Sequence, residues 1–249
     1  MKRRSLRRLA ASMGATAAML VAGGFFATAA HASGIDHYYV EIGGTGAAQP
    51  ASKGCTSSYW AANATLPAGS KAVGVCYPAT AGPWVGGVTA PSYDASVHQG
   101  YGAALALVQQ LHAENPGARI TITGYSQGAQ IGDQVLQAVA AGSFVPHGQV
   151  DGMLYADPMQ PGTGIWGHLF PKGVSLLGFT SAGAGPTDFD GIPVRRFCIH
   201  TDGICDASSI QGIGGYFVQH PTYPKHIIGD TLRFDGQNGI RWYPEGAGN

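Results

Sequence analysis

A serine between two glycines, Ser126 in the stretch GYSQG, is the first candidate for chemistry in this chain. Residues 119–124 before it alternate β-branched side chains and predict a strand, whereas residues 127–141 after it have helical apolar spacing. The glycines, Gly124 and Gly128, leave room for a sharp turn that projects a hydroxyl from a sheet. The pattern predicts a nucleophilic serine, with a helix-capping serine as the alternative.

The motif needs support from other residues, because a chain with 39 glycines can produce it by composition alone. A serine nucleophile requires a histidine base and a carboxylate that orients the histidine, and in parallel-sheet hydrolases these follow in the order Asp, His. Asp202, just past a predicted strand, is the expected carboxylate, with a turn-forming Asp-Gly pair as the alternative reading and Asp157 as the rival residue. Only His220 and His226 follow Asp202, and we predict His220 as the base.

The expected elements alternate strands with helices along the chain. Strands are predicted at residues 37–42, 72–77, 119–124, 149–155 and 194–199, and helices at residues 94–114 and 127–141. This alternation indicates a mostly parallel sheet covered on both faces, whose active site lies at the carboxyl ends of the strands. We expect Asp94 and Asp206 to cap helices and His200 to be structural.

Four cysteines occur in the chain, and all lie beyond residue 32. An exported protein would hold them as disulfides, and four cysteines allow three pairings that sequence cannot distinguish. We expect the pairs Cys55–Cys76 and Cys198–Cys205, because each closes a short loop. The C-x6-C spacing, without a second close pair, argues against a zinc site.

Export is predicted from residues 1–32, where five Lys/Arg precede a small apolar run that ends in an A-x-A cleavage pattern. A membrane anchor is the weaker alternative, and both general and twin-arginine export remain open. Residues 33–249 are expected to form one domain. Without the five basic residues, 9 Lys/Arg stand against 14 Asp/Glu, a net charge of −5, which argues against a nucleic-acid partner.

The combination of GYSQGA at residues 124–129, Cys198-x3-Asp202-x2-Cys205 and His220-x2-Tyr223 resembles the cutinase family. The segment YYVEIGGTGAA at residues 38–48, with YPA at 77–79, is more similar still to the actinobacterial PE-PPE-type serine hydrolases of the same superfamily. The resemblance covers about residues 37–233. It implies an α/β-hydrolase, a three-layer sandwich that cleaves carboxylic esters through an acyl-enzyme, without a metal or cofactor.

The resemblance also implies roles for individual residues. Ser126 would attack, His220 would shuttle the proton, and Asp202 would hold the imidazole. The second oxyanion donor maps to Gly44 or Thr45, beside the backbone N–H of Gln127 at the predicted helix start. Residues 42–46 depart from the R-G-[ST]-x-E pattern of cutinases, so a backbone N–H is expected to replace the missing side-chain hydroxyl.

Residues 158–193 form a long insertion rich in large apolar side chains. We interpret it as a lid or an acyl-chain wall, or alternatively as a surface loop that packs its own cluster.

The expected substrate is an acyl or lipid-type ester. We expect a monomer that is secreted or held in the cell envelope, with possible contact to envelope lipid. The alternative functions are a serine peptidase and a non-catalytic lipid-binding protein of the cell envelope.

Overall fold

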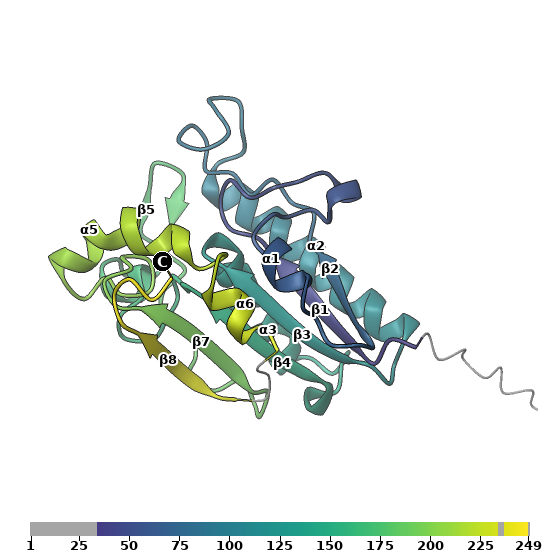
Figure 1. Cartoon of the computed structure of the whole chain (residues 1–249). Coiled ribbons are helices and arrows are strands. Elements are labelled where there is room, and N and C mark those ends of the chain that lie inside the picture. The colour runs from purple at the N-terminus through teal and green to yellow at the C-terminus, as the bar shows by residue number, and fades with distance from the viewer. Residues whose placement is uncertain (1–33, 234–236, 249) are drawn as a thin grey trace, which may run out of the picture. The chain divides into compact units, whose positions relative to one another are not determined.

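Six parallel strands form the central sheet of a computed structural model that describes residues 34–233 and 237–248 (Figure 1). The described residues form one compact unit. The sheet order is β2-β1-β3-β4-β7-β8, and every neighbouring pair is parallel. The strands are β1 (His37–Ile42), β2 (Ser70–Gly74), β3 (Arg119–Tyr125), β4 (Val150–Tyr155), β7 (Val194–Ile199) and β8 (Gly239–Tyr243).

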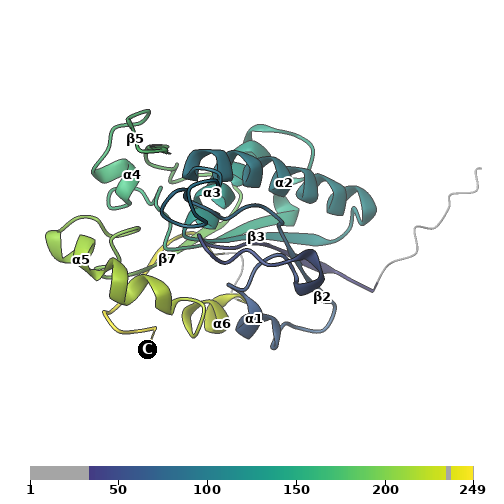
Figure 2. The same cartoon turned by 90° about the horizontal axis from the view of Figure 1, so that it is seen from above.

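Helices cover both faces of this sheet, which gives three layers (Figure 2). One face carries α2 (Tyr93–Glu114) and α3 (Gln127–Ala141), and the other carries α1 (Trp60–Asn63), α5 (Ile210–Gln219) and α6 (Ile227–Thr231). The remaining elements are α4 (Ile165–His168), a hairpin of β5 (Ser175–Leu176) and β6 (Phe179–Thr180), and the 3-10 turns η1 (Ala51–Lys53), η2 (His147–Gln149) and η3 (His220–Thr222). The predicted mostly parallel sheet, covered on both faces, is confirmed.

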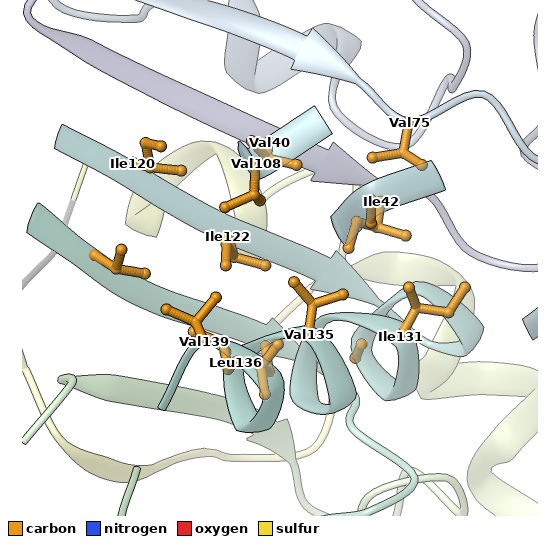
Figure 3. Close-up of a cluster of buried hydrophobic side chains, with 14 of the residues drawn as sticks. Val40, Ile42, Val75, Val108, Ile120, Ile122, Ile131, Val135, Leu136 and Val139 are labelled. Atoms are coloured by element: carbon orange, nitrogen blue, oxygen red, sulfur yellow. The ribbon is translucent and has the colours of Figure 1, made fainter. Parts of the chain in front are cut away.

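The sheet separates two apolar cores because successive side chains of a strand point to opposite faces. Ile120 and Ile122 of β3 are buried with Val135 and Val139 of α3, as Figure 3 shows. Tyr125 of the same strand belongs to the second core, on the other face. None of the described helices combines the length and the apolar character that a membrane crossing requires.

Two strand predictions differ from the structure. The second strand was expected at residues 72–77, but β2 ends at Gly74, before the disulfide-bonded Cys76. The last strand, β8, was not predicted; it is a short strand at the edge of the sheet. The predicted signal peptide, residues 1–32, lies outside the described residues.

The expected capping role of Asp94 is wrong. Ser92 caps α2, with an extended backbone and a side chain that accepts from the N–H of Ala95. Asp94 lies one residue inside the helix, and its carboxylate accepts instead from the backbone N–H and the hydroxyl of Thr180. It therefore attaches the β5–β6 hairpin to the start of α2.

The capping role expected of Asp206 is also wrong. Ser209 caps α5 and accepts from the N–H of Gly212. Asp206 lies three residues before this cap, and its carboxylate accepts from Thr201 N–H and from the Ser208 hydroxyl. Burial alone would raise the pKa of Asp206, but these bonds, led by the one from Ser208, hold it below its usual value. It closes the loop after β7.

Candidate active site

Ser126 occupies a strained turn between β3 and α3. Its φ of 59° lies in the left-handed region, which non-glycine residues adopt at a cost. A β-carbon at Gly128 would lie 2.1 Å from the carbonyl oxygen of Ile42, and one at Gly124 would lie 2.2 Å from that of Gly128. The turn thus requires both glycines. The Ser126 side chain makes no capping hydrogen bond, so the helix-capping alternative is wrong.

Ser126, His220 and Asp202 form one continuous series of hydrogen bonds. The Nε2 atom of His220 lies 2.8 Å from Oγ of Ser126, and its Nδ1 atom lies 3.0 Å from each carboxylate oxygen of Asp202. Asp202 is fully buried and His220 is 6% exposed. The structure brings these three residues together from the β3–α3 turn, the loop after β7 and the turn η3.

The loop that carries Asp202 is held by several groups. The disulfide Cys198–Cys205 closes it, and the backbone N–H of Ile204 donates to Asp202 Oδ1 at 3.1 Å. The hydroxyl of Tyr223 accepts from the N–H of Ile199 at the end of β7. Burial, and then the negative charge of Asp202, raise the pKa of Tyr223 well above its usual value, so this phenol stays neutral.

Both predicted disulfides are present in the structure, Cys55–Cys76 and Cys198–Cys205. No described cysteine is free. The short loops between the partners, 21 and 7 residues apart in sequence, therefore indicated the correct pairing among the three possibilities.

Two tyrosines that sequence reasoning missed orient His220. The ring of Tyr125 stacks on the imidazole with 5.1 Å between ring centroids, and its hydroxyl donates to the backbone carbonyl of His220. Tyr216 lies on the imidazole at 4.9 Å. Tyr125 also explains Gly44, because a β-carbon there would lie 2.8 Å from the Tyr125 ring. In the sequence, the only indication of a role for Tyr125 was its position next to Ser126.

The residues expected to form the oxyanion hole lie around the serine, and they differ in whether their polar groups already have hydrogen-bond partners. Gln127 begins α3, and its side chain points away from the serine, accepting from Ser96 Oγ and donating to the carbonyl of Thr80. The N–H of Gly44 donates to Ser58 Oγ at 3.2 Å. Thr45 lines the cavity that contains Ser126. The Gly44 amide is therefore engaged by another partner, whereas Thr45 adjoins the cavity.

A largely apolar cavity of about 450 Å³ opens beside Ser126. We call it the serine cavity. The insertion at residues 158–193 forms one wall through Pro158, Ile165, Trp166 and Phe179. None of the described residues that line it is charged. The insertion is thus part of the site rather than a loop that packs only on itself.

Residues 68–210, more than half of the chain, match the PE-PPE domain family. This chain belongs to that family. It is 30% identical over 143 residues to the "Uncharacterized PPE family protein PPE28" of Mycobacterium tuberculosis (strain ATCC 25618 / H37Rv), covering 53% of this chain and 21% of that protein. The chain therefore spans about a fifth of the length of this relative.

Solved structures place the PE-PPE domain within a wider fold class. A cutinase-like protein from Cryptococcus sp. superimposes with a TM-score of 0.53 at 18% identity, over 82% of this chain and 94% of that chain. The catalytic core domain of acetyl xylan esterase from Trichoderma reesei does so with a TM-score of 0.51 at 21% identity, over 79% and 95%. The PE-PPE domain here thus has the cutinase-like α/β-hydrolase fold.

The rival residues lie elsewhere in this PE-PPE domain. Asp157 is fully buried and accepts from Nε of Arg196 at 2.8 Å, and the same guanidinium binds Asp133 of α3. Burial, and then the charge of Asp157, raise the pKa of Asp133 to about 7. His226 is exposed at the start of α6, and His200 stacks on Trp242 at 4.6 Å. Sequence reasoning missed this buried arginine with two carboxylates.

Proposed function

We propose that this chain is an exported serine esterase that hydrolyses acyl esters through an acyl-enzyme. The observation that carries the proposal is the hydrogen-bonded series Ser126–His220–Asp202 beside an uncharged, apolar cavity. The fold shared with a cutinase-like protein and an acetyl xylan esterase supports the same reaction class. The two disulfides suit an oxidising compartment outside the cytoplasm.

In the first half-reaction, Oγ of Ser126 attacks the ester carbonyl carbon while Nε2 of His220 accepts the hydroxyl proton. The imidazolium then donates this proton to the departing alkoxide, so the alcohol leaves and an acyl-serine remains. Asp202 accepts the Nδ1–H of His220 throughout, which keeps the imidazole in the tautomer that presents a lone pair to the serine. The stacked Tyr125 limits rotation of the ring.

The oxyanion that develops on the carbonyl oxygen requires N–H donors that are free to reach it. The backbone N–H of Gln127, at the first turn of α3, is one donor and gains from the positive end of the helix dipole. Because the N–H of Gly44 already donates to Ser58, the N–H of Thr45 is the second donor in our proposal. A water molecule activated by His220 then attacks the acyl-serine and releases the carboxylic acid.

The reaction can be tested with the mature protein and p-nitrophenyl acyl esters. Ser126→Ala and His220→Ala should each lower kcat by roughly three or more decades, because a nucleophile or its base is lost. His226→Ala is the matched control and should retain full activity. A peptide substrate run in parallel should remain uncleaved. Ester turnover that persists in Ser126→Ala would refute the proposal, and its absence from the wild-type protein would favour a non-catalytic lipid-binding role.

A further inference from the structure

A second cavity, of about 400 Å³, continues from the serine cavity. We call it the tail pocket. Four aromatic or aliphatic residues line both cavities, so the two are connected: Trp84, Ile165, Trp166 and Phe179. Four more line the tail pocket alone: Phe170, Val174, Leu176 and Leu177. All eight side chains are large and apolar apart from the indole N–H groups, which distinguishes this pocket from an ordinary polar surface hollow.

The tip of the β5–β6 hairpin combines two unfavourable features at one residue. The two-residue turn consists of Leu177 and Gly178, whose φ angles are 54° and 84°, as in a type I′ turn. Such turns strongly prefer Asn-Gly, because a branched aliphatic side chain is strained in the left-handed region. Leu177 is also 66% exposed to solvent, and the neighbouring Leu176 is 62% exposed.

This hairpin is hydrogen-bonded to the start of α2. The carboxylate of Asp94 accepts from the N–H of Thr180 at 2.8 Å, and the N–H of Asp94 donates to the carbonyl of Gly178 at 3.1 Å. The hairpin is therefore fixed to the start of α2 at its base and at its turn. Leu177 thus combines backbone strain and solvent exposure in a hydrogen-bonded segment, a combination that is typical of functional positions.

We propose that the tail pocket binds the distal part of a long, unbranched acyl chain whose ester carbonyl lies at Ser126, and that Leu177 covers this chain. The inference rests on the proposed esterase function and names its substrate class. A long alkyl chain would follow the shared residues Trp166 and Phe179 from one cavity into the other. It would remove the exposed leucines from water, which an acetyl group is too short to do.

The lining of the tail pocket favours an alkyl chain over a sugar or a charged group. A sugar would leave its hydroxyls without partners against Phe170, Val174 and Leu176, and unpaired polar groups in an apolar site cost affinity. The combined space of the two cavities falls within the range of sites that enclose a ligand of substantial size. Short acyl groups would occupy only the serine cavity.

The variant Leu177→Asn tests this proposal without threatening the fold. Asparagine suits the left-handed turn better than leucine, so thermal stability should be retained or raised. With p-nitrophenyl butyrate, octanoate, laurate and palmitate in the same detergent, the wild-type kcat/KM should rise toward the longer chains. The variant should lose about tenfold on laurate and palmitate, mainly through KM, while butyrate turnover stays unchanged. Ile210→Asn, another exposed apolar residue that lines neither cavity, is the matched control.

Each outcome separates this inference from its alternatives. Ser126-dependent turnover of butyrate, without any chain-length effect of Leu177→Asn, would overturn the tail pocket while leaving the esterase intact. Equal losses for Leu177→Asn and Ile210→Asn, together with weaker binding of both variants to phosphatidylglycerol vesicles, would overturn it in favour of docking to a lipid surface. A loss confined to long chains in Leu177→Asn, with unchanged vesicle binding, would support it.

Discussion

Asp157 and Asp202 follow the adjacent parallel strands β4 and β7, and both carboxylates are fully buried. Asp202 lies 3.0 Å from the imidazole of His220, whereas Asp157 accepts from the guanidinium of Arg196 at 2.8 Å. The sequence places them in equivalent positions at the same edge of the sheet. Their partners, rather than their positions along the strands, separate a proposed catalytic carboxylate from a structural one.

The alternation of side chains along β7 explains how these partners are assigned. Phe197 packs in the core beneath α6, where it stacks on Tyr155. Arg196, its neighbour in the strand, therefore points to the opposite face, where α3 supplies Asp133. Asp157 joins that ion-pair cluster. Asp202, beyond the end of the strand in the disulfide-closed loop, is left to face His220.

The largest effect should come from replacing Asp202. In Asp202→Asn, an amide replaces the carboxylate that accepts from Nδ1–H and balances the imidazolium charge, so kcat/KM should fall by roughly three to four decades. The isosteric change should alter the free energy of unfolding by only about 1 kcal/mol. Ester turnover and urea unfolding, measured on the same preparation, would check both statements.

Asp157→Asn is the matched control for that experiment. It removes one carboxylate from Arg196, and kcat/KM per folded molecule should stay near the wild-type value. In the described part of the chain, the side chains of Arg196, Asp133 and Asp157 bond to one another and not directly to His220. An activity loss in Asp157→Asn as deep as that in Asp202→Asn would contradict the division between the two carboxylates.

The second effect concerns stability. Arg196→Met would leave Asp133 and Asp157 buried without their cation, so the free energy of unfolding should fall by about 3–5 kcal/mol. Burial already raises the pKa of Asp133 to about 7 with the arginine present, and removal of the cation should raise it further. A raised carboxyl pKa means that the folded state binds the proton more tightly than the unfolded chain does. The loss of unfolding free energy in Arg196→Met should therefore be larger at pH 8 than at pH 5, two conditions chosen on either side of this pKa.

Urea unfolding of Arg196→Met at both pH values would measure this loss. Arg195→Met, whose guanidinium is partly exposed and donates to the carbonyl of Asn238, is the control and should cost less than about 1 kcal/mol. A loss that does not depend on pH would indicate that packing of the arginine stem, rather than its charge, stabilises the cluster.

The smallest effect extends the comparison to a third buried carboxyl. Among the residues that the structure describes, neither a histidine nor an arginine pairs with Glu41 of β1, which accepts a hydrogen bond from the amide of Asn63. Burial raises the pKa of Glu41 to about 8. Because the folded state holds this proton more tightly than the unfolded chain, stability should decline as the pH rises from 4.5 to about 8. Glu41→Gln should remove part of that decline.

Melting temperatures at about pH 5 and pH 9 would show the difference. We expect the melting temperature of Glu41→Gln to fall by several degrees less than that of the wild type over this interval, because the amide of the variant binds no proton. Glu114→Gln, at the exposed end of α2, is the control and should follow the wild type. Identical pH profiles for Glu41→Gln and the wild type would contradict the raised pKa.

Rules that act over a few neighbouring residues accounted for most of the elements that the sequence predicted correctly. Side-chain periodicity located β1 and α3 with their observed bounds, and the steric demand of a sharp turn explained Gly124 and Gly128. Cap positions were less predictable, because Ser92 and Asp94 are both good capping residues two positions apart. Only the direction of the chain before α2 determined which of them accepts the helix N–H.

Features that depend on distant segments were not predictable in the same way. Tyr125 and His220 are 95 residues apart, and no spacing rule connects their rings. The Arg196 cluster joins the loop after β4 to α3 and β7, and the tail pocket joins the hairpin to Trp84. Such contacts arise when sheet order brings segments together, which short-range patterns do not encode.

The sequence by itself determined the serine turn, the parallel sheet and the order of Ser126, Asp202 and His220, because backbone sterics and side-chain periodicity act within a few residues. The tertiary structure decided between candidates that the sequence left open: His220 rather than His226 meets the serine, and Asp157 meets an arginine. Those choices depend on which face of the sheet each side chain occupies and on which buried charge can be paired there, and burial makes an unpaired charge too costly to leave.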